Sequence, residues 1–542
     1  MASIPETPEM VPRGTLLIAK EPSTLKHQTE RPDVGRLLGG ELKTLARESS
    51  HYMLGLLCNA GIGLISFPIF TRVLPISEYG VMDLGQRLLL VLTIASKLGL
   101  QNASLRFYNR EKFAADADAA RSYYSTLFFG MLGTSICVVL TGALLVSVLP
   151  KKSMLGPLSG LVYLILALVL LRAMGAAFWG FLRIEQRTKV FNVLTVCTRA
   201  TTLAAVCSLL PFIGRSARTY FTGTVVVETG LIVGLTVWLV SRGVLATKHF
   251  KLDLFRAAIV YGTPLVLYEL AYAVLVSADR FLVRHYVGAD ALGFYSVAYG
   301  LANNVNEFLV APLGLALIPI YMKIWNSDGT EKTSAFLTTA FNIFMLAGVG
   351  VLAAIAASGH SIVVFLASQK YAGADRLIPV ILAGLLVYGA NVFVAAGLLI
   401  HKRTMQMSWM LVIAAALNIG LNCLLLPRMG LMGGAVATLL SYLVCITMLA
   451  TASNRVLPLH TDVLSCAKYL LAGVLAWLAG SQIIVSTALG DLLVKSAVVF
   501  AVYLGSLYFL DERTRSAARW IFAWARKSLA RGLDNELEQG AE

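Results

Sequence analysis

The chain has 542 residues, of which 57% are hydrophobic and only 14% are charged, and its formal net charge is +15. Soluble domains carry about 25% charged residues and cannot hide this much apolar surface from water, so the composition excludes a soluble protein. The basic excess lies in short loops and tails, where it sets membrane orientation, and this placement argues against nucleic acid as a partner.

Residues 1–48 are polar and contain prolines and basic residues, so we expect a cytoplasmic tail. Apolar runs of roughly 20 residues follow along nearly the whole chain, each long enough to span a bilayer as a helix. We therefore predict an all-α polytopic membrane protein with about 14 transmembrane helices, followed by a basic amphipathic cytoplasmic tail at 511–542. The predicted spans lie at about 50–75, 80–105, 122–149, 155–182, 190–213, 220–241, 257–286, 292–321, 334–358, 376–400, 405–426, 431–453, 465–487 and 492–510.

Basic residues are divided unevenly between the two sets of loops. If both termini lie on one side of the membrane, that side has 30 Lys and Arg residues and the other side has 10. Because the cytoplasmic side carries this excess, the N- and C-termini are both predicted to be cytoplasmic. No predicted external loop is longer than about 20 residues, so we expect no extracytoplasmic domain.

Short motifs recur at offsets of 212 to 216 residues. The matched pairs are Arg187-Thr188 with Arg403-Thr404, Pro211 with Pro427, Gly214 with Gly430, Arg72 with Arg284, and Gly80 with Gly293. Spans 1–6 and 7–12 are therefore predicted to form two six-helix lobes related by a pseudo-two-fold axis, with two extra helices appended. Such lobes enclose the substrate cavity of alternating-access transporters. The predicted units are 49–256, 257–456 and 457–510.

Charged side chains inside a membrane are costly, so each is a candidate functional residue. Those of the first lobe are mostly basic, which favours a cationic cavity for a phosphate or an acidic sugar. The candidate substrate-binding residues are Arg87, Lys97, Arg172, Arg199 and, in the second lobe, Arg280.

Acidic residues inside the membrane have two interpretations that the sequence leaves open. They either pair with the cations or bind a coupling ion, H⁺ or Na⁺. The candidate ion-coupling residues are Glu228, Glu269, Asp279, Asn303 and Glu307. The alternative for Asp279 and Arg280 is a local salt bridge at the outer surface. Asn418 and Asn422, one turn apart, are predicted to hydrogen-bond between helices.

Enzyme and metal signatures are weak in this chain. The seven cysteines lack metal-ligand spacing, and we expect neither a metal site nor another cofactor. The pair Asp116-x-Asp118 is similar to the metal-binding pair of glycosyltransferases, but no soluble domain surrounds it, so we predict a helix cap. Polysaccharide polymerases and ligases usually present catalytic residues on a long external loop, and we therefore expect no enzyme activity.

Three stretches carry a family resemblance: FPIFTRVLPISEYGVMDL (67–84), SADRFLVRHYVGADALGFYSVAYG (277–300) and LNIGLNCLLLPRMGLMGGAVATLLSYL (417–443). They resemble the Wzx-type polysaccharide flippases of the multidrug/oligosaccharidyl-lipid/polysaccharide exporter superfamily. The resemblance implies a flippase that moves undecaprenyl-pyrophosphate-linked oligosaccharide across the bacterial inner membrane, for O-antigen lipopolysaccharide or exopolysaccharide. It further implies a cationic lumen, and partners among membrane lipids and the polymerase and glycosyltransferases of the same pathway. A lipid II flippase and a multidrug or cation antiporter of the same superfamily are the alternatives.

Overall fold

The computed structural model describes residues 55, 58–108, 116–148, 158–512 and 515. Every regular element among these residues is a helix, as the composition predicts. The predicted tail at 1–48 and nearly all of the predicted tail at 511–542 lie outside the described residues.

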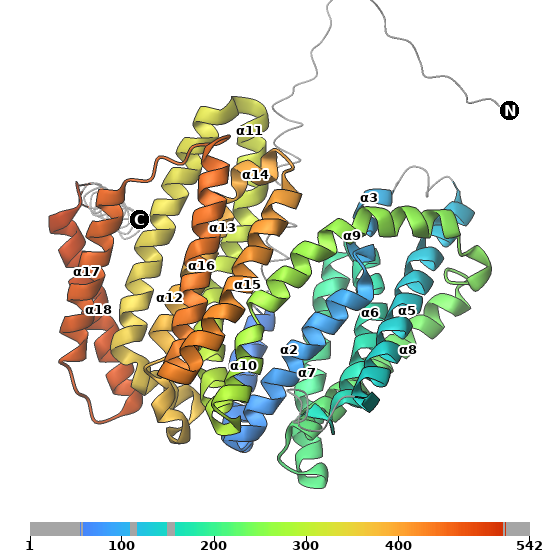
Figure 1. The fold of residues 1–542 in the computed structure, drawn as a ribbon, viewed down its shortest axis with the longest axis horizontal. Coiled ribbons are helices and arrows are strands. Elements are labelled where there is room, and N and C mark those ends of the chain that lie inside the picture. The colour runs from blue at the N-terminus through green and yellow to red at the C-terminus, as the bar shows by residue number, and fades with distance from the viewer. Residues whose placement is uncertain (1–54, 56–57, 109–115, 149–157, 513–514, 516–542) are drawn as a thin grey trace, which may run out of the picture. The chain divides into compact units, whose positions relative to one another are not determined.

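The first half of the described chain folds into helices that pack mainly against one another, and we call them the first helix group (Figure 1). Within the group, α6 contacts α2, α5, α7 and α8. The members are the helix Cys58–Val73, α2 (Ile76–Lys97), α3 (Leu100–Phe107), α5 (Ala117–Val148), α6 (Val162–Ile184), α7 (Thr188–Ile213) and α8 (Ala217–Ser241).

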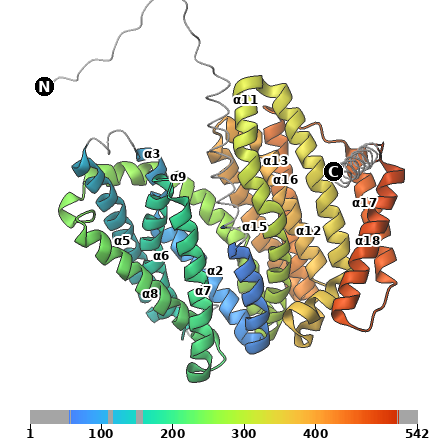
Figure 2. The same cartoon turned by 180° about the vertical axis from the view of Figure 1, so that it is seen from behind.

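The second helix group follows α9 (Leu252–Leu275), which packs against α2, α3 and α5 of the first group and against α15 of the second (Figure 2). The last two helices, α17 and α18, pack against α11 and against each other. The members are α10 (Ala278–Tyr286), α11 (Ala289–Ile362), α12 (Ile378–Gly389), α13 (Asn391–Val394), α14 (Ala396–Ile400), α15 (Thr404–Met429), α16 (Leu431–Asn454), α17 (Val463–Ser481) and α18 (Ala488–Leu510).

Ten helices in the described residues are long and apolar enough to cross a membrane, and the bent pair α2–α3 makes an eleventh span. The fourteen spans predicted from the sequence exceed these eleven for two reasons. Helix α11 contains two predicted spans joined at Gly329, where the backbone is non-helical (φ 79°). In addition, the apolar helices Cys58–Val73 and Ile378–Val394 are shorter than a full span. When these are counted, each of the fourteen predicted segments corresponds to helix.

The repeated Arg-Thr motif has the same backbone conformation in both copies. Gln186 and Lys402 have left-handed backbone, with φ of 57° and 56°. The next residue, Arg187 or Arg403, donates its N–H to the carbonyl oxygen five residues earlier, at 2.9 Å in both cases, and precedes the first residue of α7 or α15. The local geometry therefore agrees with an internal repeat at this offset.

Candidate functional site

Two cavities with charged residues in their walls lie between helices of the first group, and they share Lys97, Ala176 and Trp179. The smaller cavity, of about 280 Å³, also contains Arg172 and Glu228. The larger, of about 390 Å³, contains Gln101 and Arg183. We call the two together the Lys97 cavity. Three cationic side chains therefore face one connected region, opposed by a single carboxylate among its described lining residues.

Arg172 and Glu228 bring opposite charges from α6 and α8 into this cavity. Arg172 Nη2 lies 3.1 Å from Glu228 Oε1, and Arg172 Nε donates to the same oxygen at 3.2 Å. Because the Arg172 side chain is still 39% exposed, the pair is open to exchange with a ligand.

Lys97 ends α2 and has a neutral hydrogen-bond partner. Its Nζ donates to Gln101 Oε1 at 2.7 Å. Arg183, in the last turn of α6, lies over the ring of Phe191 at 5.9 Å. Among the described residues, neither cation forms a salt bridge, so both retain charge that an anion could neutralise.

Glu269 of α9 is held by two amides of α3. Gln101 Nε2 donates to both carboxylate oxygens, at 3.0 and 2.9 Å, and Asn102 Nδ2 donates to Oε1 at 2.8 Å. Gln101 thus connects Lys97, a predicted substrate-binding residue, with Glu269, a predicted ion-coupling residue. Glu269 also lines a separate cavity between α3 and α9.

Arg280 and Asp279 lie in a buried charge cluster and contact none of these cavities. Arg280 is 0% exposed; its Nη1 donates to Asp279 Oδ1 at 2.7 Å and to Val276 O at 2.6 Å. Its guanidinium carbon lies 3.5 Å from the ring centroid of Tyr299. The local salt bridge given as the alternative for Asp279 and Arg280 is therefore present, but it is buried and does not lie at a surface.

Asp83 of α2 connects this cluster to the first helix group. Asp83 Oδ2 lies 3.6 Å from Arg280 Nε, and Arg87 Nη2 lies 3.2 Å from Asp83 Oδ1. The predicted residues Arg87 and Arg280 therefore share one carboxylate that the sequence analysis did not single out. A signal was available in the sequence, because Asp83 and Arg87 lie at i and i+4 of one helix, the spacing of an intrahelical ion pair.

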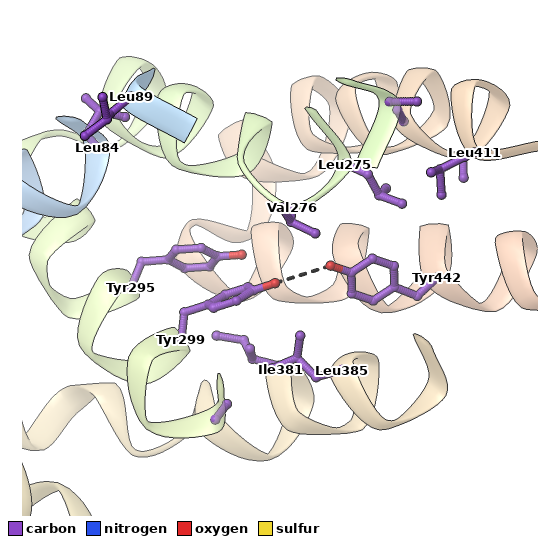
Figure 3. Close-up of a cluster of buried hydrophobic side chains, with 14 of the residues drawn as sticks. Leu84, Leu89, Leu275, Val276, Tyr295, Tyr299, Ile381, Leu385, Leu411 and Tyr442 are labelled. Carbon is purple, nitrogen blue, oxygen red and sulfur yellow. Dashed lines mark hydrogen bonds between the residues drawn. The ribbon is translucent and has the colours of Figure 1, made fainter. Parts of the chain in front are cut away.

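Hydroxyl and amide groups complete the cluster on the side of the second helix group. Tyr295 OH donates to Asp279 Oδ2 at 2.8 Å, and the hydroxyls of Tyr299 and Tyr442 lie 3.3 Å apart (Figure 3). Asn422 Nδ2 donates to Asn418 O within α15 at 2.9 Å, and Asn418 Nδ2 lies 3.5 Å from Thr438 Oγ1 of α16, a long contact between helices. Both asparagines are fully buried, in agreement with a structural role.

The remaining predicted residues are not among the lining residues of the Lys97 cavity. Arg199 Nη1 donates to Asn59 O at 2.8 Å, at an exposed position. Asn303 Nδ2 donates to Glu307 Oε1 at 2.9 Å on the exposed side of α11. The structure therefore brings together Lys97, Arg172 and Glu228, and it places Arg199, Asn303 and Glu307 elsewhere.

The two helix groups are connected by polar contacts near the start of α2. Arg72 Nη2 donates to Phe365 O at 2.6 Å, and Lys370 Nζ donates to Leu74 O at 2.7 Å. Thr71 Oγ1 donates to Ala367 O at 3.1 Å. Burial lowers the pKa of the Lys370 ammonium from its ordinary value. We call this the Arg72 contact.

The cap predicted before span 3 is confirmed. Asp116 Oδ1 accepts the backbone N–H groups of Asp118 and Ala119 at 2.9 and 3.0 Å, at the start of α5. Among the described residues, no three His, Cys, Asp or Glu side chains lie together as a metal site would require.

The fold is shared with membrane transporters. A structure described as the lipid II flippase MurJ in an inward closed conformation matches with a TM-score of 0.64 and 12% identity, covering 84% of this chain and 98% of that one. An inward-facing multidrug resistance MATE family transporter of the MOP superfamily matches with a TM-score of 0.58 and 13% identity, covering 74% and 94%. Its outward-facing counterpart has a TM-score of 0.52 and 15% identity, covering 76% and 95%.

These matches show that the chain has the helical fold of these membrane transporters. The family model described as polysaccharide biosynthesis protein matches residues 45–325, which is more than half of the chain. The chain therefore belongs to this polysaccharide biosynthesis protein family. None of the curated proteins compared with the chain matches it.

Proposed function

We propose that this chain is an alternating-access flippase for undecaprenyl-pyrophosphate-linked oligosaccharide, used in O-antigen or exopolysaccharide export. The observation that carries the proposal is the Lys97 cavity, whose wall contains Lys97 of α2 and both Arg172 and Arg183 of α6. A pyrophosphate loses its hydration shell on entering a membrane, and Arg and Lys donors replace that water.

The alternating-access part of the proposal rests on the division into two helix groups. The lobes would be residues 49–256 and 257–456, with 457–510 as two added helices. The Arg72 contact joins the groups at the predicted outer end, whereas Lys97 lies 21 residues along α2 from Ile76, about 30 Å away at 1.5 Å per residue. A substrate would thus enter the Lys97 cavity from the predicted cytoplasmic side.

The basic cavity disfavours a multidrug or cation antiporter, because like charge repels an organic cation. A lipid II flippase shares the chemistry of a lipid pyrophosphate and remains the second candidate, since the MurJ structure has the same fold. In both cases Glu228 and Glu269 would be the acids that bind a coupling proton or Na⁺.

The proposed location is the bacterial inner membrane, with both termini in the cytoplasm. There the chain would receive its substrate from membrane glycosyltransferases and deliver it to a polysaccharide polymerase. Its action moves a lipid without making or breaking a covalent bond, so it requires no catalytic residue and no cofactor beyond the coupling ion.

Deletion of the chain followed by measurement of lipid-linked oligosaccharide on the inner leaflet tests the proposal. We expect such material to accumulate, and wild-type protein to remove it. Lys97→Ala and Arg172→Ala should restore less than about a tenth of this transport. The matched control is Arg121→Ala, because Arg121 is an exposed arginine paired with Asp118 at the start of α5. Full rescue by both cavity variants, or no accumulation after deletion, contradicts the proposal.

A further inference from the structure

A third cavity, of about 490 Å³, lies between α3 and α9 and has a different chemistry from the Lys97 cavity. Its volume falls in the range of small-molecule sites. We call it the α3–α9 cavity. Its wall combines aromatic rings, an amide, a carboxylate and one cation, and its described lining residues are Asn102, Leu105, Arg106, Tyr261, Leu265, Tyr268 and Glu269.

One face of α9 forms most of this wall. Tyr261, Leu265 and Tyr268 follow one another at i, i+4 and i+7, so their side chains lie in one row along the helix. Tyr261 is 42% exposed, although its ring is an apolar surface that core packing normally covers. The same row continues to Tyr272, whose ring stacks on Tyr388 of α12 with the centroids 5.6 Å apart.

Polar groups with unused capacity face the same space. A carboxylate can accept about four hydrogen bonds, and Glu269 accepts three N–H bonds from the two α3 amides. Asn102 uses one of its two amide N–H groups in this contact. One acceptor position of Glu269 and the rest of the Asn102 amide therefore remain for a ligand that carries both donors and acceptors.

The two cavities are adjacent, because Asn102 and Leu105 line both of them. A ligand that places an anion against Lys97 and Arg183 would carry its next chemical group past α3 into the α3–α9 cavity. In a lipid-linked glycan, the group next to the pyrophosphate is the first sugar. Sugars present apolar C–H faces that stack on aromatic rings, and hydroxyls that bond amides and carboxylates.

From this juxtaposition we infer that the α3–α9 cavity binds the glycan part of the substrate. Tyr261 and Tyr268 stack on the sugar rings. Glu269 accepts a hydrogen bond from a sugar hydroxyl, and Asn102 fixes the orientation of the sugar ring. Arg106 at the end of α3 would favour an acidic sugar at the outer part of the cavity. The inference rests on the proposed function, because it assigns the second half of the same substrate.

Binding of two probes to the full chain in lipid nanodiscs tests this inference. The first probe is the lipid-linked glycan extracted from cells that lack this chain. The second is undecaprenyl pyrophosphate, which has no sugar. We expect wild-type protein to bind the first probe more tightly than the second.

Variants of the α3–α9 cavity then show which residues cause this difference in affinity. Tyr261→Ala should weaken binding of the glycan probe about tenfold and change binding of undecaprenyl pyrophosphate by less than about twofold, because Tyr261 is not among the lining residues of the Lys97 cavity. Tyr261→Phe keeps the ring and should bind almost as well as wild type. Tyr163→Ala is the matched control, because Tyr163 is an exposed tyrosine of α6 outside the described cavity walls.

The outcomes separate this inference from the proposed function. Equal binding of both probes by wild type overturns the glycan site and leaves the flippase proposal standing. A Tyr261→Ala variant that weakens both probes equally also overturns it, and assigns the cavity to the lipid chain through Leu105 and Leu265. If cells lacking the chain accumulate no lipid-linked glycan, the proposed function fails and the glycan site fails with it.

Discussion

Gly80 of α2 and Gly293 of α11 pack backbone against backbone. A Cβ atom on Gly80 would lie 2.8 Å from the backbone nitrogen of Gly293 and 3.1 Å from its Cα. The two glycines occupy matching positions of the internal repeat. Matching residues of a two-fold pair meet only near the axis, so the predicted two-fold axis, if present, would pass between α2 and α11.

The first prediction concerns this close approach. Gly80→Ala would force α2 and α11 apart, because the atoms it meets belong to the backbone and cannot rotate away. We expect a loss of about 1–3 kcal/mol in stability, the usual effect of overpacking, measured by thermal unfolding of the full chain in detergent. Gly133→Ala in α5 is the control, since a Cβ there meets nothing within 4 Å. Equal stability of the two variants would contradict the contact.

The second prediction concerns the buried charge cluster. Asp279→Asn leaves Arg280 with Asp83 as its remaining carboxylate, 3.6 Å from Nε, in a site with 0% exposure. Removing one partner of a buried pair costs about 3–5 kcal/mol, so we expect strong destabilisation. The double variant Asp279→Asn/Arg280→Met should lose less stability than the summed losses of the two single variants, because it removes both charges together.

A double-mutant cycle measured by unfolding of the full chain provides this test. The exposed pair Asp328 and Lys332 in α11 offers a control cycle, since charges that face solvent couple weakly. If the stability losses of the Asp279 and Arg280 variants are additive, the two charges do not interact favourably.

The third prediction concerns the Arg72 contact. Lys370→Met removes the ammonium that donates to Leu74 O and should weaken closure of the two helix groups at this end. A loss of about 1 kcal/mol changes the ratio of closed to open protein roughly fivefold. Distances between spin labels at the exposed positions Arg215 and Arg376, in a background without the seven native cysteines, report the change. Lys332→Met is the charge-matched control, and a shift as large in that variant would count against the contact.

Much of the fold was predictable from the sequence because membrane helices have strong apolar signals. The repeat was also visible, since Arg187 and Arg403 precede helices of similar sequence at a fixed offset. The turn before each helix was not visible, because Gln186 and Lys402 adopt a left-handed backbone that glycine normally provides. The break between the two spans of α11 was predicted, because the polar run at 326–333 separates two apolar segments. The predicted loop at 323–332 is instead helix on both sides of a single non-helical residue, Gly329.

The candidate site was only partly predictable, because contacts between distant helices leave no local pattern. Lys97 and Arg172 were identified from their charge within apolar runs, and both line the Lys97 cavity. Asp83 has a local partner in Arg87 at i+4, but its contact with Arg280 joins residues nearly 200 positions apart and leaves no local pattern. The tyrosine row of α9 did have a signal in its helical spacing, but the search for intramembrane charge excluded neutral aromatic residues.

The last prediction concerns Glu228, which neutralises Arg172 at 3.1 Å in the Lys97 cavity. An anionic ligand must compete with this carboxylate for the guanidinium. Glu228→Gln keeps the shape of the side chain and removes its negative charge, so the cavity becomes more positive. Because a partly exposed ion pair contributes up to about 1 kcal/mol, we expect undecaprenyl pyrophosphate to bind up to about fivefold more tightly. Transport should become slower, since tighter binding delays release.

Titration of the full chain in nanodiscs measures the affinity, with Glu185→Gln as the control, because Glu185 pairs with Arg187 outside the cavity. Weaker binding by Glu228→Gln would mean that this carboxylate holds Arg172 in place for the ligand.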